Sequence, residues 1–282
     1  MPESRELDLH IPSGTLHAQR FGSEAAPLVL CLPGLSANMR GFDFLGERLC
    51  RPDRQVVAID MRGRGRSSVT GPGTYGWESH ARDAFAAASA LGAESFAVIG
   101  MSMGAYVATQ MAAIEPGRLE RLVLIDACGA PDPAAVAPIG AAVARLGTVF
   151  PSVERYLELA RGLGTVRPWS EYWERYFRYD LEPVEGGVRA RSDAQAVLED
   201  ARYGQEHSPY ALWPHLTMPV LLLRASQELL PGCGRIVSDA DRERFPREVP
   251  GAQVVEVDAN HYGINTVEPS ALAIEEFIGR PS

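Results

Sequence analysis

A Gly-x-Ser-x-Gly motif at residues 100–104 constrains the fold of this chain more than any other feature. An apolar run at residues 96–99 precedes it, and a good helix-forming stretch follows at residues 105–113. A strand, a sharp turn with a serine at its apex and a helix are the setting in which this motif presents a nucleophile. The motif therefore predicts an α/β fold with a reactive serine at the end of a strand.

The two glycines of the motif have a steric purpose. The turn is tight and strained, so the positions two before and two after the serine must be nearly free of side chain, and Gly100 and Gly104 meet that need. The same turn is expected to project the Ser102 hydroxyl into a cleft. It also places the backbone N–H of Met103 at a helix N-terminus, where it can stabilise an oxyanion.

Apolar, strand-like runs alternate with helical patterns over most of the chain. This alternation predicts a mostly parallel central sheet with helices on both faces. The predicted strands are residues 28–32, 55–60, 96–99, 122–126, 220–224 and 254–258, and the clearest helices outside the motif are residues 78–91 and 267–278.

The pattern changes between residues 131 and 213, where strand-like runs vanish and aromatic-rich helical segments take over. We interpret residues 131–213 as an all-helical cap, inserted into a core formed by residues 1–130 and 214–282. A cap of this kind covers the carboxyl edge of the sheet and encloses a cavity, which some of its aromatic side chains should line. The candidates for this lining are Trp169, Tyr172 and Trp173.

Charge and composition exclude several classes of function. The chain has 282 residues and a net charge of −9, so nucleic acid is not an expected partner. All its basic side chains are arginines, which excludes a Schiff-base lysine. The four cysteines form no CxxC pair and have no metal-ligand spacing, so neither a metal nor a cofactor is expected.

The apolar runs are too short to cross a membrane, and the polar N-terminus does not resemble a secretory signal. These features predict a cytoplasmic protein with no membrane association. The oligomeric state cannot be predicted from this sequence.

A serine hydroxyl needs a base to accept its proton, and His261 is the best placed of six histidines. It follows the last apolar strand, as Ser102 follows the strand at residues 96–99. Because the carboxyl ends of parallel strands share one edge of a sheet, the two side chains are expected to meet there. We therefore predict that His261 is the general base of a serine hydrolase.

These motifs make the chain resemble a capped α/β-hydrolase of the esterase and lactonase type over nearly its whole length. Residues 33–35 match the family's His-Gly-x turn, with Pro33 in place of the usual histidine. The third residue of that turn donates an oxyanion-hole N–H, so the resemblance implies that Leu35 works together with Met103. Residues 60–67 resemble the family's Asp-x-Arg-Gly-x-Gly-x-Ser loop, which is mainly structural.

The resemblance leaves two candidates for the acid of the catalytic triad. Most family members place it in a turn after the strand that follows the cap, where residues 224–228 read Arg-Ala-Ser-Gln-Glu, so Glu228 would be the acid. Others place it after the strand that follows the nucleophile helix, and that position is Asp126. We predict Glu228 as the acid, with Asp126 as the alternative.

The expected activity is hydrolysis of a small, apolar carboxylic ester or lactone through an acyl-enzyme on Ser102. A carbon–carbon bond hydrolase of the same fold would keep the same triad and is an alternative. A ligand-binding protein that retains the fold without turnover is another. Dehalogenases and epoxide hydrolases of this fold use an aspartate nucleophile, which Ser102 argues against.

Overall fold

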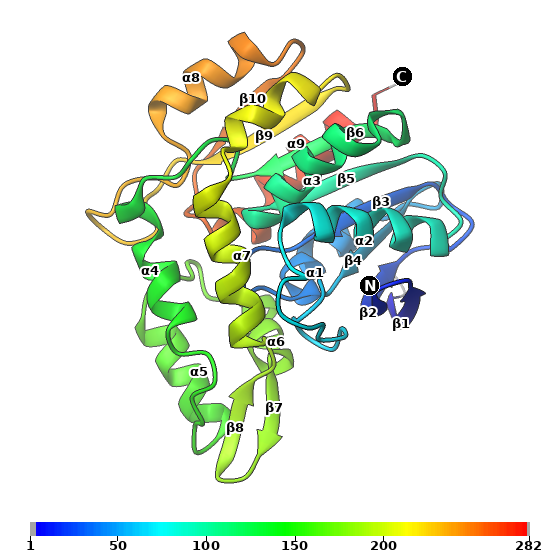
Figure 1. The fold of residues 1–282 in the computed structure, drawn as a ribbon. Coiled ribbons are helices and arrows are strands. Elements are labelled where there is room, and N and C mark those ends of the chain that lie inside the picture. Colours follow the sequence, from blue (N-terminus) through cyan, green and yellow to red (C-terminus); the bar gives the residue numbers. More distant parts are fainter. Residues whose placement is uncertain (1–3, 281–282) are drawn as a thin grey trace.

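The computed structural model describes residues 4–280 and contains one eight-stranded sheet (Figure 1). Its strands form where the sequence is most continuously apolar, and four of them are buried along their entire length. Alternating polar residues would leave one face of a strand suited to water, whereas these runs suit burial on both faces. The strands of this sheet are β1 (Ser4–Ile11), β2 (Gly14–Phe21), β3 (Leu28–Leu32), β4 (Gln55–Ile59), β5 (Phe96–Met101), β6 (Leu119–Ile125), β9 (Val220–Ala225) and β10 (Gln253–Val257).

The strand order is β1-β2-β4-β3-β5-β6-β9-β10. The hairpin of β1 and β2 joins the sheet antiparallel to β4, and the six strands from β4 to β10 are parallel. The central strand β5 therefore has its carboxyl end beside those of β3 and β6. Ligands bind at this edge in open α/β sheets.

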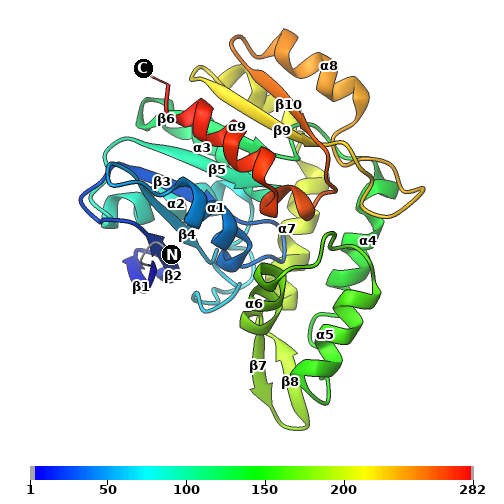
Figure 2. The ribbon, with the colours of Figure 1, turned by 180° about the vertical axis from the view of Figure 1, so that it is seen from behind.

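Helices cover both faces of the sheet, as predicted. The face seen in Figure 1 carries α2 (Trp77–Ala90), α3 (Met103–Ile114) and α8 (Asp239–Glu248). The opposite face, seen in Figure 2, carries α1 (Asp43–Leu49) and α9 (Glu268–Ile278). Each face has its own apolar cluster, and the two clusters use alternate residues of the same strands.

The cap, which we define as residues 131–213, extends away from the sheet in Figures 1 and 2. It contains α4 (Pro133–Val143), α5 (Val153–Gly162), α6 (Glu171–Tyr179) and α7 (Ala194–Glu206), followed by a 3₁₀ segment at Pro209–His215. The prediction that the cap is all-helical is wrong. It also contains an antiparallel hairpin of β7 (Leu181–Val184) and β8 (Gly187–Ala190), whose turn residues Gly186 and Gly187 both have positive φ angles.

The hairpin was missed because each of its strands has only four residues. A period-two pattern is barely visible over so short a stretch, and Glu185-Gly186-Gly187 was the available turn signal.

Within residues 4–280, no helix is both long enough and apolar enough to cross a membrane.

Candidate active site

Ser102 occupies the strained turn that its motif predicts. It lies between β5 and α3 with a φ angle of 55° and a ψ angle of −120°, a conformation that non-glycine residues rarely adopt. Its backbone N–H donates to the Ile125 carbonyl at 2.9 Å, which fixes the turn against the end of β6. Strain of this kind persists where the surrounding structure holds it, and it is common at reactive serines.

The two motif glycines are required by close packing. A Cβ atom on Gly100 would lie 2.2 Å from the Gly104 carbonyl oxygen, and one on Gly104 would lie 2.0 Å from the Leu32 carbonyl oxygen. Both positions therefore exclude any side chain. This allows α3 to start directly above the sheet, next to the end of β3.

Asp126 follows β6 and also has a left-handed backbone, with a φ angle of 51°. Its N–H donates to the Leu223 carbonyl at 2.7 Å, and its Oδ1 accepts from the Ala225 N–H at 3.0 Å. These two bonds hold the carboxylate over the end of β9. Its Oδ2 then lies 2.8 Å from Nδ1 of His261, and both side chains are almost completely buried.

The structure pairs His261 with Asp126 and not with Glu228, so the preferred expectation for the acid is corrected. Glu228 lies in the loop after β9, and its carboxylate accepts the N–H groups of Gly232 at 2.6 Å and Gly234 at 3.2 Å. These bonds close the glycine-containing turn of its own loop. Sequence spacing alone could not distinguish the two candidates, because both follow strands that end at the same edge.

His261 is 2% exposed and lies in the turn that follows β10. With Nδ1 held by a carboxylate, the proton-accepting nitrogen of the neutral ring is Nε2. The preceding residue, Asn260, anchors this turn: its Oδ1 accepts the Gly263 N–H at 2.9 Å, and its Nδ2 donates to the Thr165 carbonyl in the cap at 2.8 Å.

The loop at residues 33–35, predicted to supply an oxyanion donor from Leu35, packs against Ser102. A Cβ atom on Gly34 would lie 3.3 Å from the Ser102 Cβ. The Leu35 carbonyl accepts a hydrogen bond from Nε of Arg64 at 2.9 Å, which fixes the orientation of the peptide that follows Leu35.

Arg64 connects this loop to the cap. Its guanidinium is completely buried and forms an ion pair with Asp200 of α7, with an N–O distance of 2.6 Å. Asp200 also lies 2.8 Å from Nε2 of His80 and accepts the Gly76 N–H at 2.6 Å. Burial alone would raise the pKa of Asp200, but the charges of His80 and Arg64 and these hydrogen bonds lower it below its usual value.

The resemblance implied that the loop containing Arg64 is mainly structural, and the sequence did not indicate its contact with Leu35. Asp200 was also missed, because it and Arg64 lie far apart along the chain and no local pattern joins them. The sequence signal that could have indicated this ion pair was an acidic residue, Asp200, among the apolar positions of the buried face of α7.

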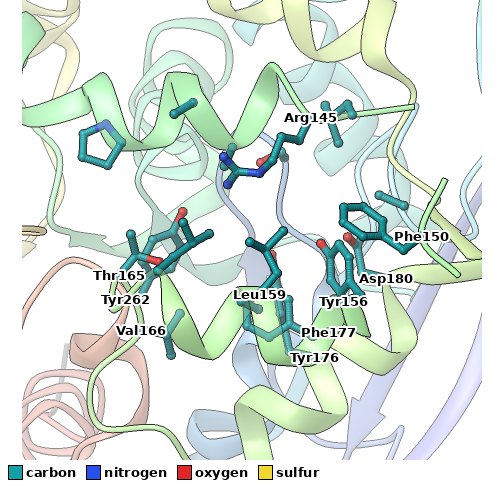
Figure 3. A pocket seen from close by; sticks show the side chains of 18 of the residues that line it. Arg145, Phe150, Tyr156, Leu159, Thr165, Val166, Tyr176, Phe177, Asp180 and Tyr262 are labelled. Atoms are coloured by element: carbon teal, nitrogen blue, oxygen red, sulfur yellow. The ribbon is translucent and has the colours of Figure 1, made fainter. Parts of the chain in front are cut away.

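A cavity of about 170 Å³ lies between the cap and the core (Figure 3). Its core side is lined by Ser36, next to Leu35, and by Tyr262, next to His261, whereas Ser102 and His261 themselves do not line it. Most of the remaining lining is aromatic or aliphatic and comes from the cap, including Phe150, Tyr156, Leu159 and Phe177.

None of the three aromatic residues predicted to line the substrate pocket lines this cavity. Trp169 stacks on Phe177 with a centroid distance of 5.4 Å, and Tyr172 donates its hydroxyl to Glu47 of α1 at 2.7 Å. Trp173 lines a separate hollow of about 20 Å³ beside Gly34 and Met101. Tyr176, one turn after Trp173, lines both spaces.

Of the three predicted aromatic residues, Trp173 thus lines the smaller hollow, whereas Trp169 and Tyr172 line neither space. Residues 173, 176 and 177 share one face of α6. Their i, i+3, i+4 spacing in the sequence could have indicated which side of the helix faces the core. Trp169 and Tyr172 instead support the packing within the cap and between the cap and α1.

Within residues 4–280, no group of three or more histidine, cysteine or acidic residues is arranged to hold a metal ion. The four cysteines are free thiols, and three of them are buried.

Comparison with known proteins identifies the family. The sequence profile of the alpha/beta hydrolase fold matches residues 27–264, so this chain belongs to the α/β-hydrolase fold family. It is similar to a solved structure of E-2-(acetamidomethylene)succinate hydrolase, with a TM-score of 0.85 and 26% identity over 99% of this chain and 100% of that one.

Two curated relatives match a shorter stretch. N-formylmaleamate deformylase from Pseudomonas putida is 40% identical over 110 residues, which are 39% of this chain and 40% of that protein. A serine hydrolase-like protein from Danio rerio is 35% identical over 125 residues, 44% of this chain and 38% of that protein. The chain thus matches less than half the length of these two relatives, which are named as hydrolases of different kinds.

Proposed function

We propose that this protein is a serine hydrolase in which Ser102 attacks the carbonyl carbon of a carboxylic ester or lactone. The observation that carries the proposal is the buried contact between His261 and Asp126, together with a serine in a strained turn whose N–H bonds the carbonyl of Ile125, the residue before Asp126. An aspartate that orients a histidine, next to a sharp turn carrying a serine, is the arrangement that activates a hydroxyl.

The proposed reaction proceeds in two halves. Nε2 of His261 takes the Ser102 proton while the hydroxyl oxygen bonds to the carbonyl carbon, and the Asp126 carboxylate stabilises the imidazolium that forms. The backbone N–H groups of Leu35 and Met103 hold the oxyanion. His261 then gives the proton to the leaving alcohol, and a water molecule that His261 deprotonates releases the acid from Ser102.

An amide hydrolase is the second candidate, and a specific observation favours it. A deformylase is 40% identical to part of this chain, and the hydrolase structure with a TM-score of 0.85 bears a name that denotes an acetamido compound. The same residues would serve both reactions, since only the leaving group differs. A carbon–carbon bond hydrolase and a non-catalytic binding protein, the remaining alternatives from the sequence, lack an observation of this kind.

The test is the hydrolysis of p-nitrophenyl esters from acetate to decanoate, with p-nitroanilides of the same acyl groups alongside. We expect wild type to turn over the esters, and Ser102→Ala to lose at least about 10³-fold in kcat without a change in melting temperature. Ser95→Ala, an exposed serine that bonds Glu120, is the control. Unchanged hydrolysis in Ser102→Ala would refute the proposal, and faster turnover of the anilides would favour the amide candidate.

A further inference from the structure

The cavity beneath the cap contains an arginine that the proposed chemistry does not use. Arg145 follows the C-terminal end of α4, and its side chain extends into the cavity (Figure 3). The proposed mechanism needs a serine, a histidine, an aspartate and two backbone donors, all of which come from the core. A charged side chain among the cap's apolar lining therefore calls for its own explanation.

Arg145 has no partner within the described part of the chain. Its guanidinium forms no hydrogen bond, ion pair or cation–π contact with any of residues 4–280, although it is partly buried. Several other cap arginines are paired, Arg155 with Glu158, Arg161 with Glu174 and Arg189 with Glu182, whereas Arg202, which also has no partner among residues 4–280, is exposed to solvent. A guanidinium that loses part of its hydration without a counter-ion is unfavourable, so the site is suited to an anion supplied from outside.

Arg145 shares its cavity with a residue that adjoins the proposed general base. Tyr262, the neighbour of His261, lines the same cavity, and its ring centroid lies 5.5 Å from that of His261. Burial raises the pKa of the Tyr262 hydroxyl to about 12, and the charge of Arg145 opposes this rise. Arg145 is therefore electrostatically close to a residue adjoining the proposed general base.

The far wall of the cavity is apolar and aromatic. The rings of Phe150 and Tyr156 meet edge to face at a centroid distance of 5.0 Å, and Tyr156 lies 6.0 Å from Phe177 in a similar arrangement. Such a wall suits the carbon skeleton of a ligand and excludes water from its charged end. Exclusion of water strengthens the attraction between a guanidinium and an anion.

One carboxyl group, that of Asp180, also lines the cavity. It limits the negative charge of a ligand that the cavity can bind. Asp180 is buried, and burial raises its pKa to about 7, so it is mostly protonated in acidic solution and only about half ionised in neutral solution. One guanidinium balances one negative charge. A phosphate dianion would bring a second charge without a partner next to Asp180, whereas a carboxylate matches the planar fork of arginine and brings only one.

The position at a helix end does not explain the side chain. A cation near a helix C-terminus interacts favourably with the helix dipole, and that would account for an arginine exposed at the end of α4. It does not account for a guanidinium directed into an apolar cavity. We propose that Arg145 binds a free carboxylate of the substrate, so that the natural substrate is an acyl compound carrying one negative charge beyond the scissile carbonyl group.

This inference rests on the proposed function, and its test separates the two. The substrates are the mono-p-nitrophenyl esters of adipic and suberic acid, each compared with its neutral methyl ester. In wild type we expect kcat/KM for at least one acid to exceed that for its methyl ester by tenfold or more. Arg145→Gln should reduce this preference below threefold while the neutral ester is still hydrolysed within threefold of wild type.

Two further variants sharpen the result. Arg145→Lys keeps the charge but not the planar fork and should show an intermediate preference. Arg155→Gln removes an exposed arginine of the same cap and should retain the full preference. If wild type shows no preference for either acid, or if Arg145→Gln keeps the preference, the inference is wrong.

If wild type hydrolyses none of these esters, the proposed function has failed, and binding decides the inference. Calorimetric titration with monomethyl adipate then compares wild type with Arg145→Gln. Binding that weakens at least tenfold in the variant would support a carboxylate site without the proposed catalysis. Equal binding to both proteins, or binding to neither, would overturn it.

Discussion

The sheet domain and the cap both contribute side chains to the region around Ser102, but they hold those side chains in different ways. Ser102, Asp126 and His261 each follow a parallel strand, and backbone hydrogen bonds between neighbouring strands fix the first two. The cap contributes Arg145 from the end of α4, Tyr156 from α5, and Phe150, whose backbone exchanges two hydrogen bonds of 2.8 Å with Val188 of β8. The three proposed catalytic side chains thus lie on the sheet domain, whereas most of the cavity lining comes from the cap.

Aromatic packing joins the two regions, as between Trp173 and Tyr262, and so do several buried polar contacts. Asp200 of α7 pairs with Arg64, the Tyr179 hydroxyl donates to the buried Asp60, and Tyr172 donates to Glu47. Buried polar contacts of this sort fix one arrangement, because each is costly to break. These polar contacts help to fix the position of the cap over the edge of the sheet.

The largest effect on activity is expected from removing the proposed base, which lies in the core. His261→Ala leaves the Ser102 proton without an acceptor, and we expect kcat for the preferred ester to fall about 10⁵-fold. Steady-state kinetics measures the loss. His207→Ala, which changes an exposed histidine stacked on Tyr203 in the cap, should stay within twofold of wild type. A loss of less than about tenfold in His261→Ala would mean that another group accepts the proton.

The next largest effect should distinguish the two acids. Asp126→Asn keeps a residue that tolerates the left-handed backbone and an oxygen able to accept the Ala225 N–H, but it removes the charge beside His261. We expect kcat to fall about 10⁴-fold. Glu228→Gln should change kcat by less than about threefold, since Glu228 supports only its own turn. The reverse ranking would restore Glu228 as the acid.

Breaking the ion pair between Arg64 of the core and Asp200 of the cap should have an intermediate effect on kcat. Asp200→Asn leaves Arg64 buried without a counter-charge, which we expect to cost about 3–5 kcal/mol of stability. Because Arg64 also holds the Leu35 carbonyl, kcat should fall about tenfold even where the protein remains folded.

The matched control breaks another buried pair of the same loop. Asp83→Asn removes the carboxylate paired with Arg62 at 2.5 Å, in a pair that makes no contact with Leu35. It should lower the free energy of unfolding but leave kcat within twofold, and urea titration together with ester turnover measures both. Equal effects of the two variants on kcat would show that Arg64 has no role in positioning the oxyanion loop.

The smallest expected effect concerns the cap alone. Burial raises the pKa of Asp180 to about 7, above its ordinary value of 3.8. The folded protein therefore holds a proton that the unfolded chain releases, and the stability linked to this group is full below pH 4 and is lost as pH rises to about 7. We expect the stability of wild type relative to Asp180→Asn to fall by about 1–3 kcal/mol between pH 4 and pH 8. A pH-independent difference in urea unfolding would contradict this.

The same contrast explains which parts of the site could be predicted from the sequence. The nucleophile motif and the positions of His261 and Asp126 depend on local strand and turn patterns, and parallel strands bring their carboxyl ends together. These residues could therefore be proposed from the sequence, although Glu228 was preferred over Asp126. That choice depends on which carboxylate the backbone aims at His261, through the Ala225 and Leu223 contacts, and no local pattern records this.

The cap was less predictable for a physical reason. Which face of α6 meets the cavity depends on how α5 and the hairpin of β7 and β8 pack against it, so Trp169 and Tyr172 were assigned to a lining formed instead by Tyr176 and Phe177. Arg145 carries no motif at all. Its significance appears only when the cavity and the absence of a partner within residues 4–280 are seen together.

The measurement that tests the central claim most directly is the site of attachment of an active-site phosphonate. After incubation with a fluorophosphonate and proteolysis, mass spectrometry should find a single adduct on the peptide containing Ser102. The adduct should be lost in Ser102→Ala and form much more slowly in His261→Ala. An adduct on another residue, or none in a preparation that hydrolyses esters, would contradict the account.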